Sequence, residues 1–144
     1  MAGYSGTPLL KKIGIKERQK IVASRAPESF FRELGKLPDG TEVLARAKPP
    51  VDVAVAFVKS RADLNQQFSR LAPVLGADGM LWVAWPKKSS GVSTDLNENV
   101  IRDIGLPLGL VDIKVCAIDE IWSGLKFVIR KEKRRKREAG GVMG

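Results

Sequence analysis

The chain has 144 residues and a mass of 15.7 kDa, with 44% hydrophobic and 28% charged side chains, a composition typical of one globular domain. Its net charge at pH 7 is +9, because 25 lysines and arginines outnumber 16 aspartates and glutamates. The absence of histidine excludes Ser-His-Asp and Cys-His catalysis, and the single cysteine, Cys116, excludes an intrachain disulfide. We therefore expect no metal ion and no cofactor.

The first half of the chain predicts short helices that alternate with apolar strands. Prolines stand where helices open, glycines stand where they close, and the apolar runs are short enough for strands. The expected elements are a helix that starts at Thr7-Pro8 and stops at Gly14, a strand from Lys20, a helix from Pro27 to Gly35, a strand over 41–46 and a strand over 52–58.

The second half contains the clearest helix of the sequence. Ser60 is a suitable N-cap and Asp63 stands at the third helical position, close to a capping box. Leu64, Phe68, Leu71 and Leu75 then recur at helical spacing and predict one buried stripe. The elements expected after it are a strand over 80–85, a helix capped by Thr94, and a hairpin of strands over 111–117 and 124–131.

This order predicts an α/β, three-layer Rossmann-like fold, in which a mainly parallel sheet of about six strands closes with an antiparallel hairpin. The connection between Arg46 and Asp52 is too short for a crossover helix. We favour an extended return through the Pro-Pro segment. The alternatives are that the second strand is antiparallel or is merely an edge.

Three segments are expected along the chain. Residues 1–17 form an N-terminal segment with a short helix, 18–131 the Rossmann-like domain, and 132–144 a basic tail that frays into solvent. The N-terminus lacks the pattern of a signal peptide, and no apolar run approaches the length of a membrane span. A cytoplasmic protein with no membrane contact is therefore expected.

From about Arg18 to Arg130, the element order resembles a shortened class I methyltransferase fold. The stretch 71–79 leading into Leu81-Trp82-Val83 is similar to the helix, glycine turn and strand in the second half of such enzymes. Most of the chain is closer still to a family of small, uncharacterised bacterial proteins with a domain of unknown function. The residues that carry this second resemblance are GYSGTP (3–8), FVKSRADL (57–64), WVAWPKKSSGVSTDL (82–96) and GLVDIKVCAIDEIWSGLKFV (109–128).

The chain departs from the methyltransferases at both of their cofactor-binding features. The resemblance implies an acidic-x-Gly-x-Gly loop after the first strand, but Val22 is followed by 23–27 with no glycine. It also implies an acidic residue at the end of the second strand, where this chain has Ala45-Arg46-Ala47. Methyl transfer from adenosylmethionine therefore remains a less favoured alternative, because a shared fold does not confer function.

Cations follow the ends of four consecutive predicted strands. In open α/β sheets, ligands bind beyond the carboxyl ends of the strands, and helix starts expected at Pro27, Arg61 and Asp95 would add backbone N–H donors there. We therefore predict a site for an anionic, phosphate- or nucleotide-containing small molecule. Its expected residues are Ser24, Arg25, Arg46, Lys48, Lys59, Arg61, Lys87, Lys88, Ser89, Ser90, Gly91 and Asp119.

No residue is assigned a catalytic role. Asp95, Asp119 and Glu120 are carboxylates expected near the same edge, but a helix's first turn and a solvated hairpin turn are the favoured interpretations. Cys116 lies in an apolar strand, where packing is favoured over nucleophilic chemistry.

The basic tail supports a second function. The run 130–138 holds seven cations and two anions, which favours either a solubilising end or an arm that attracts nucleic acid without reading its sequence. The cations of this arm are Arg130, Lys131, Lys133, Arg134, Arg135, Lys136 and Arg137. A third alternative is an interaction module whose cofactor site has been lost.

Overall fold

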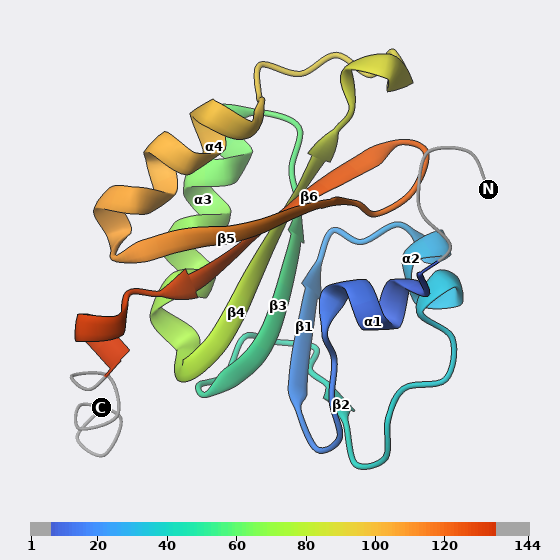
Figure 1. Cartoon of the computed structure of the whole chain (residues 1–144), viewed down its shortest axis with the longest axis vertical. Helices are drawn as coiled ribbons and strands as arrows, with labels where there is room; N and C mark the ends of the chain where they lie inside the picture. Colours follow the sequence, from blue (N-terminus) through green and yellow to red (C-terminus); the bar gives the residue numbers. More distant parts are fainter. Residues whose placement is uncertain (1–6, 135–144) are drawn as a thin grey trace.

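The structure is a computed structural model that describes residues 7–134 of the chain. Its centre is a six-stranded sheet in which β1 to β4 run parallel and β5 and β6 form an antiparallel hairpin (Figure 1). The strand order is β2-β1-β3-β4-β6-β5. The predicted α/β class and closing hairpin are thus confirmed. The strands are β1 (Lys20–Ser24), β2 (Glu42–Val43), β3 (Val51–Phe57), β4 (Leu75–Pro86), β5 (Leu110–Ala117) and β6 (Trp122–Ile129).

The helices pack against the two faces of this sheet. Helices α1 and α2 pack on one face and α3 and α4 on the other, so the three expected layers are present. Within residues 7–134, no helix is long and apolar enough to cross a bilayer. The α-helices are α1 (Leu9–Ile13), α2 (Glu28–Leu34), α3 (Arg61–Leu71) and α4 (Glu98–Gly105), and the short 3-10 turns are η1 (Ala72–Val74), η2 (Lys88–Ser90) and η3 (Leu106–Leu108).

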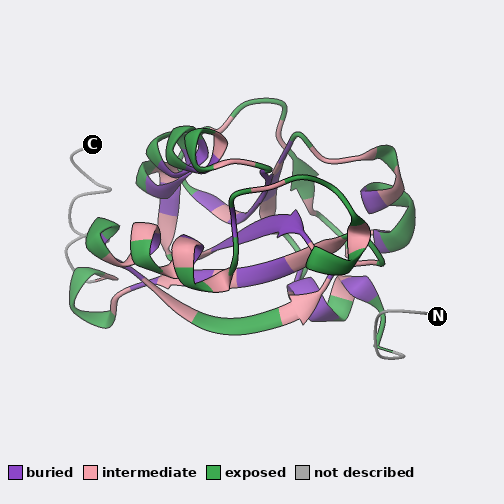
Figure 2. Ribbon diagram, turned by 90° about the horizontal axis from the view of Figure 1, so that it is seen from above, coloured by how far each residue is buried: buried purple, intermediate pink, exposed green. Residues whose placement is uncertain are grey.

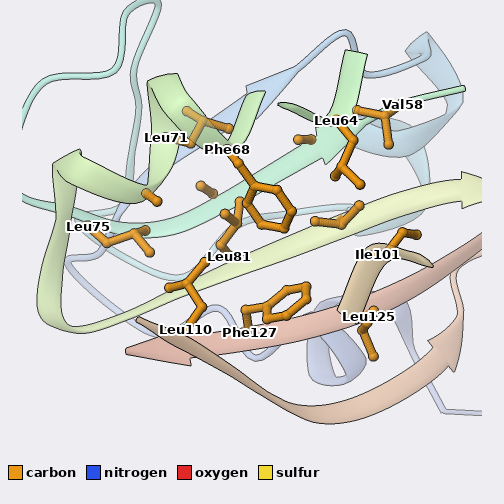
Figure 3. Close-up of a cluster of buried hydrophobic side chains, with 14 of the residues drawn as sticks. Val58, Leu64, Phe68, Leu71, Leu75, Leu81, Ile101, Leu110, Leu125 and Phe127 are labelled. Carbon is orange, nitrogen blue, oxygen red and sulfur yellow. The ribbon is translucent and has the colours of Figure 1, made fainter. Parts of the chain in front are cut away.

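Two apolar cores lie on opposite faces of the sheet, and Figure 2 shows the buried strands between partly exposed helices. On the α3/α4 side, Leu64, Phe68 and Leu71 of the predicted stripe are buried on α3, and the rings of Phe68 and Phe127 meet edge to face at 5.4 Å (Figure 3). The stripe was predicted one turn too long, because α3 ends at Leu71 and Leu75 is the first residue of β4. On the α1/α2 side, Trp82 is fully buried and its indole N–H donates to the carbonyl of Ile13 at 3.0 Å. Strands β3 and β4 supply side chains to both cores, as expected for strands covered on both faces.

The two long helices differ in how well their starts are predicted. Ser60 caps α3 as expected, and its hydroxyl accepts a hydrogen bond from the backbone N–H of Asp63. The predicted cap of α4 is wrong, because Asn97 caps this helix by accepting from the N–H of Val100. Thr94 lies in the preceding loop, where its hydroxyl donates to the carbonyl of Lys59 at 2.6 Å.

Strand β2 is much shorter than the predicted strand over 41–46. Its two residues pair in parallel with Lys20 and Ile21 at the edge of the sheet, and residues 44–50 return to β3 without a helix. The parallel pairing excludes an antiparallel second strand, and the strand is an edge. The return through 44–50 bends at 45–46 and again at 49–50.

The first residues of the basic tail are helical. Residues 131–134 form a helical turn instead of fraying, and the N–H of Arg134 donates to the carbonyl of Arg130 at 3.1 Å. The expectation of a flexible tail beyond this turn concerns residues that lie outside the described range.

Candidate functional site

A pocket of about 380 Å³ lies at the carboxyl edge of the sheet, where the parallel strands end. Arg25 follows β1, Lys59 follows β3, and β6 starts at this edge because Trp122 pairs with Pro86, the last residue of β4. The chain therefore brings the ends of β1 and β3 and the start of β6 around one hollow. The lining residues are Arg25, Pro27, Phe57, Lys59, Asp63 and Trp122.

Arg25 is held over this pocket by an unusual backbone and by two side-chain partners. Its φ is +58°, a left-handed conformation uncommon for residues other than glycine. Its guanidinium forms an ion pair with Asp63 at 2.9 Å and donates to the side-chain oxygen of Gln66 at 3.3 Å. The hydrogen bond from Arg25 lowers the pKa of Asp63 below its ordinary value, although partial burial opposes this shift.

Lys59 supplies the second cation of the pocket. Its backbone is fixed on both sides, because its N–H donates to a carboxylate oxygen of Asp63 at 3.4 Å and its carbonyl accepts from Thr94. Its side chain is exposed, and its ammonium takes part in none of the ion pairs within residues 7–134. Lys59 is therefore the cation best placed to meet an incoming anion.

Aromatic rings form the apolar wall of the pocket. The rings of Phe57 and Trp122 meet edge to face at 5.0 Å, and Phe57 also contacts Phe30 beneath it. The sequence analysis did not assign Phe57, Pro27, Asp63 or Trp122 to the site. Trp122 could have been predicted from the expected hairpin turn. The turn lies at this edge, so the first residue of the strand that follows it lies there too.

Ser24 lies close to the site, but its hydroxyl is already engaged. It is 7% exposed and accepts a hydrogen bond from the guanidinium of Arg70 at 2.8 Å. Arg70 also donates to the side chain of Gln67, which is buried. No sequence signal singled out Arg70, which stands in the last turn of α3.

Arg46 and Lys48 are not brought to the carboxyl edge. Strand β2 ends opposite Ile21, three residues before β1 ends, so the chain has left the sheet short of that edge. Both residues are exposed in the connection 44–50, which leads back to the amino edge where β3 starts. The expectation that four strand exits share one rim is therefore wrong for the second strand.

The loop 87–91 does follow β4 at the carboxyl edge, but none of its residues lines the pocket described above. The N–H of Lys87 donates to the carbonyl of Ile121 at 2.7 Å, which ties the loop to the hairpin turn. Lys88, Ser89 and Ser90 form η2, and the hydroxyl of Ser90 donates to the carbonyl of Lys87. Gly91 ends this turn with a left-handed φ of +77°.

The start of α3 offers fewer open donors than expected. The N–H of Arg61 donates to a carboxylate oxygen of Asp95 at 2.9 Å, and the N–H of Asp63 donates to the capping hydroxyl. Asp95 itself lies before α4 rather than in its first turn, because this helix begins at Glu98. These contacts are local capping, so the cationic side chains that line the pocket at this edge are those of Arg25 and Lys59.

The remaining candidate side chains have structural roles. A carboxylate oxygen of Asp119 accepts from the N–H groups of Ile121 and Trp122 at 2.8 and 2.7 Å, which closes the hairpin turn. Cys116 packs against the α1/α2 core, and burial raises the pKa of its thiol. Residues 7–134 hold no group of three or more Cys, Asp or Glu side chains that could bind a metal ion.

The described part of the basic tail uses two of its arginines locally. Arg130 and Arg134 donate to the carbonyls of Leu106 and Ile129, whereas Lys131 and Lys133 are exposed. Arg135, Lys136 and Arg137 lie outside the described residues.

Comparison with solved structures identifies the class of fold. The chain is similar to a SAM-dependent methyltransferase from Aquifex aeolicus, with 14% identity, a TM-score of 0.57, and coverage of 88% of this chain and 90% of that one. It is also similar to the protein in a DhpI–SAH complex, with 8% identity, a TM-score of 0.58, and coverage of 85% of this chain and 81% of that one. A third similar structure is a TehB-like SAM-dependent methyltransferase from Corynebacterium glutamicum, with 10% identity, a TM-score of 0.53, and coverage of 85% of each chain. This is a class I methyltransferase-like Rossmann fold, and at these identities the likeness concerns the fold alone.

No protein-family model matches the chain, and no curated protein does. The resemblance to a family of small bacterial proteins therefore stays a prediction.

The residues at the carboxyl edge do not fit adenosylmethionine in the way that the methyltransferase resemblance implies. The turn after β1 carries Arg25 in place of a glycine, and its side chain crosses to Asp63. Strand β2 ends three residues before β1 does, and its acidic residue, Glu42, pairs with Lys20 at the start of β1, away from the edge where a ribose would bind. We therefore derive no methyl transfer from this site.

Proposed function

We propose that this chain is a Rossmann-like binding domain for an anionic small molecule that contains a phosphate or a nucleotide. The pocket formed by Arg25, Lys59 and the rings of Phe57 and Trp122 carries the proposal. Its two cations and one carboxylate leave a net positive charge, and its aromatic wall is apolar. This combination suits a ligand that has both a charged group and a planar or apolar part.

The roles of the two cations differ. Arg25 is already paired with Asp63, so it contributes a guanidinium that is fixed in the lining of the pocket. Lys59 has no carboxylate partner among the described residues and supplies the charge that an anion would neutralise. The loop 87–91 lies at the same edge, and we propose that it approaches a ligand that extends beyond the pocket.

The test is ligand binding by the full chain, measured by thermal shift and by calorimetry. The panel contains nucleotides, coenzyme A compounds, sugar phosphates and adenosylmethionine. We expect at least one phosphate compound to raise the melting temperature, and Lys59→Ala to weaken its binding about tenfold. The matched control is Lys36→Ala, which removes one exposed cation outside both the pocket and the loop 87–91.

Two results would overturn the proposal. One is that no anion stabilises the protein. The other is that Lys59→Ala and Lys36→Ala weaken binding equally, because binding would then depend on overall charge and not on the pocket. Binding of adenosylmethionine in preference to all phosphate compounds would instead support the methyltransferase alternative.

A further inference from the structure

Four lysines gather where hairpin β5–β6 meets α1, away from the pocket. Lys114 of β5 and Lys126 of β6 are direct cross-strand partners, so their side chains share one face of the sheet. Lys12 lies in α1 and Lys16 follows it. The ammonium of Lys114 donates to the carbonyl of Lys12 at 3.4 Å, and that of Lys12 donates to the carbonyl of Ala117 at 3.1 Å. We call these four residues the lysine face.

The lysine face brings like charges close together. Like charges directly opposite each other destabilise a strand pair. Burial lowers the pKa of Lys126, and the nearby charges of Lys114 and Lys16 lower it further. None of the ion pairs within residues 7–134 includes Lys16, Lys114 or Lys126. Within residues 7–134, no ion pair therefore offsets the repulsion among Lys16, Lys114 and Lys126.

The lysine face is open to a large partner. Lys16 and Lys114 are exposed, Lys126 is half-buried and Lys12 is buried, and Figure 1 shows no helix in front of the hairpin. The register places Val111 and Val128 in the next row of the same face, and both are only partly buried. A small molecule needs a concave site, whereas an open sheet face with clustered cations suits an extended polyanion.

The chemistry of the face favours a nucleic-acid backbone over other polyanions. We propose that the phosphates of a nucleic acid bind across the lysine face, without base recognition. Trp82 shares this face but is fully buried, so it offers no ring for base stacking. Strand β6 leads directly into Arg130 and Lys131, and Lys131 and Lys133 are exposed. The valines beside the lysines are too short and too buried to insert into a lipid surface.

The experiment measures binding of the full chain to a fluorescent single-stranded oligonucleotide by anisotropy over a series of salt concentrations. The test variant is Lys114→Ala/Lys126→Ala. The matched control is Lys36→Ala/Lys48→Ala, which removes the same charge from exposed lysines elsewhere. We expect the test variant to bind at least about fivefold more weakly than the control and to lower the slope of log Kd against log salt by about 1.4, or about 0.7 for each lost contact.

Three results would overturn the proposal. The first is that the test and control variants bind alike at every salt concentration. The second is that removal of residues 135–144 abolishes binding while the lysine pair has no effect, which would place the whole contact on the tail. The third is stronger binding to polyglutamate or to anionic vesicles than to the oligonucleotide. Circular dichroism of each variant verifies that it is folded.

Discussion

Arg25 combines two demands that a single residue seldom meets. The tight turn between β1 and α2 requires a left-handed backbone, which glycine adopts without steric cost. The ion pair with Asp63 requires a long cationic side chain, which glycine lacks. Strained residues of this kind concentrate at functional sites, and here the strained residue lines the pocket.

Two substitutions separate these demands. Arg25→Gly and Arg25→Ala both remove the guanidinium, but only glycine relieves the left-handed φ. We expect Arg25→Gly to be more stable than Arg25→Ala by about 1 kcal/mol, measured by urea denaturation. Both variants are expected to lose affinity for an anion in the pocket. Equal stabilities would show that the turn relaxes to an ordinary φ when the side chain is removed.

The ion pair of Arg25 with Asp63 also predicts that the stability of the protein depends on pH. Because Arg25 lowers the pKa of Asp63 in the folded protein, the unfolded chain takes up a proton at this carboxyl first as the pH falls. The stabilisation by the pair is therefore fully present above the ordinary carboxyl pKa of 3.8 and is lost as the pH falls through the lower folded value.

The measurement is the difference in unfolding free energy between the wild type and Asp63→Asn on both sides of pH 3.8. We expect the advantage of the wild type to be constant near neutral pH and to shrink in acid. All other carboxyls titrate alike in the two proteins, so they cancel in the difference. An advantage that does not change in acid would contradict the lowered pKa.

At the scale of the element, prediction succeeded where local signals agreed. Helix α3 has a capping hydroxyl at Ser60, an acidic residue in its first turn and a long apolar stripe, and all three are local. The start of α4 was missed because Thr94 and Asn97 are both good caps, and the choice depends on a contact between Thr94 and the distant carbonyl of Lys59. Strand β2 was overestimated because 41–46 has strand composition but only two residues find a partner.

The end of α4 gives a test of helix packing on the sheet. A Cβ added at Gly105 would lie 2.6 Å from the ring of Phe127 and 3.2 Å from that of Phe68. Both rings are buried in the core, so they have little room to move. We expect Gly105→Ala to destabilise the protein by about 1–3 kcal/mol, because overpacking outweighs the gain in helix propensity.

Urea denaturation in two backgrounds identifies the cause of this loss. The cost of Gly105→Ala should fall in a Phe127→Leu background, in which the smaller side chain makes space for the new methyl group. An unchanged cost would place the strain in the backbone of α4 rather than in the aromatic contact.

At the scale of the molecule, the sequence predicted the sheet and its order of elements better than the site. The carboxyl edge was predictable from strand ends alone, and it does hold Arg25, Lys59 and Lys87. Which of the predicted site residues converge depends on two features that are not local. The short β2 keeps Arg46 and Lys48 away from the edge, and the ion pair of Arg25 with Asp63 joins residues far apart in the sequence. Local patterns contain no signal for such contacts.

The two cores share the strands β3 and β4, and this sharing predicts that the domain unfolds as one unit. Phe68 lies in the α3/α4 core and Phe30 in the α1/α2 core, and both are 2% exposed. We expect Phe68→Ala and Phe30→Ala each to lower the unfolding free energy by about 3–5 kcal/mol. In both variants, tryptophan fluorescence and far-UV circular dichroism should report one coincident transition, because neither core can lose its packing while the central strands remain folded. Separate transitions for the two probes would mean that each face of the sheet folds independently of the other.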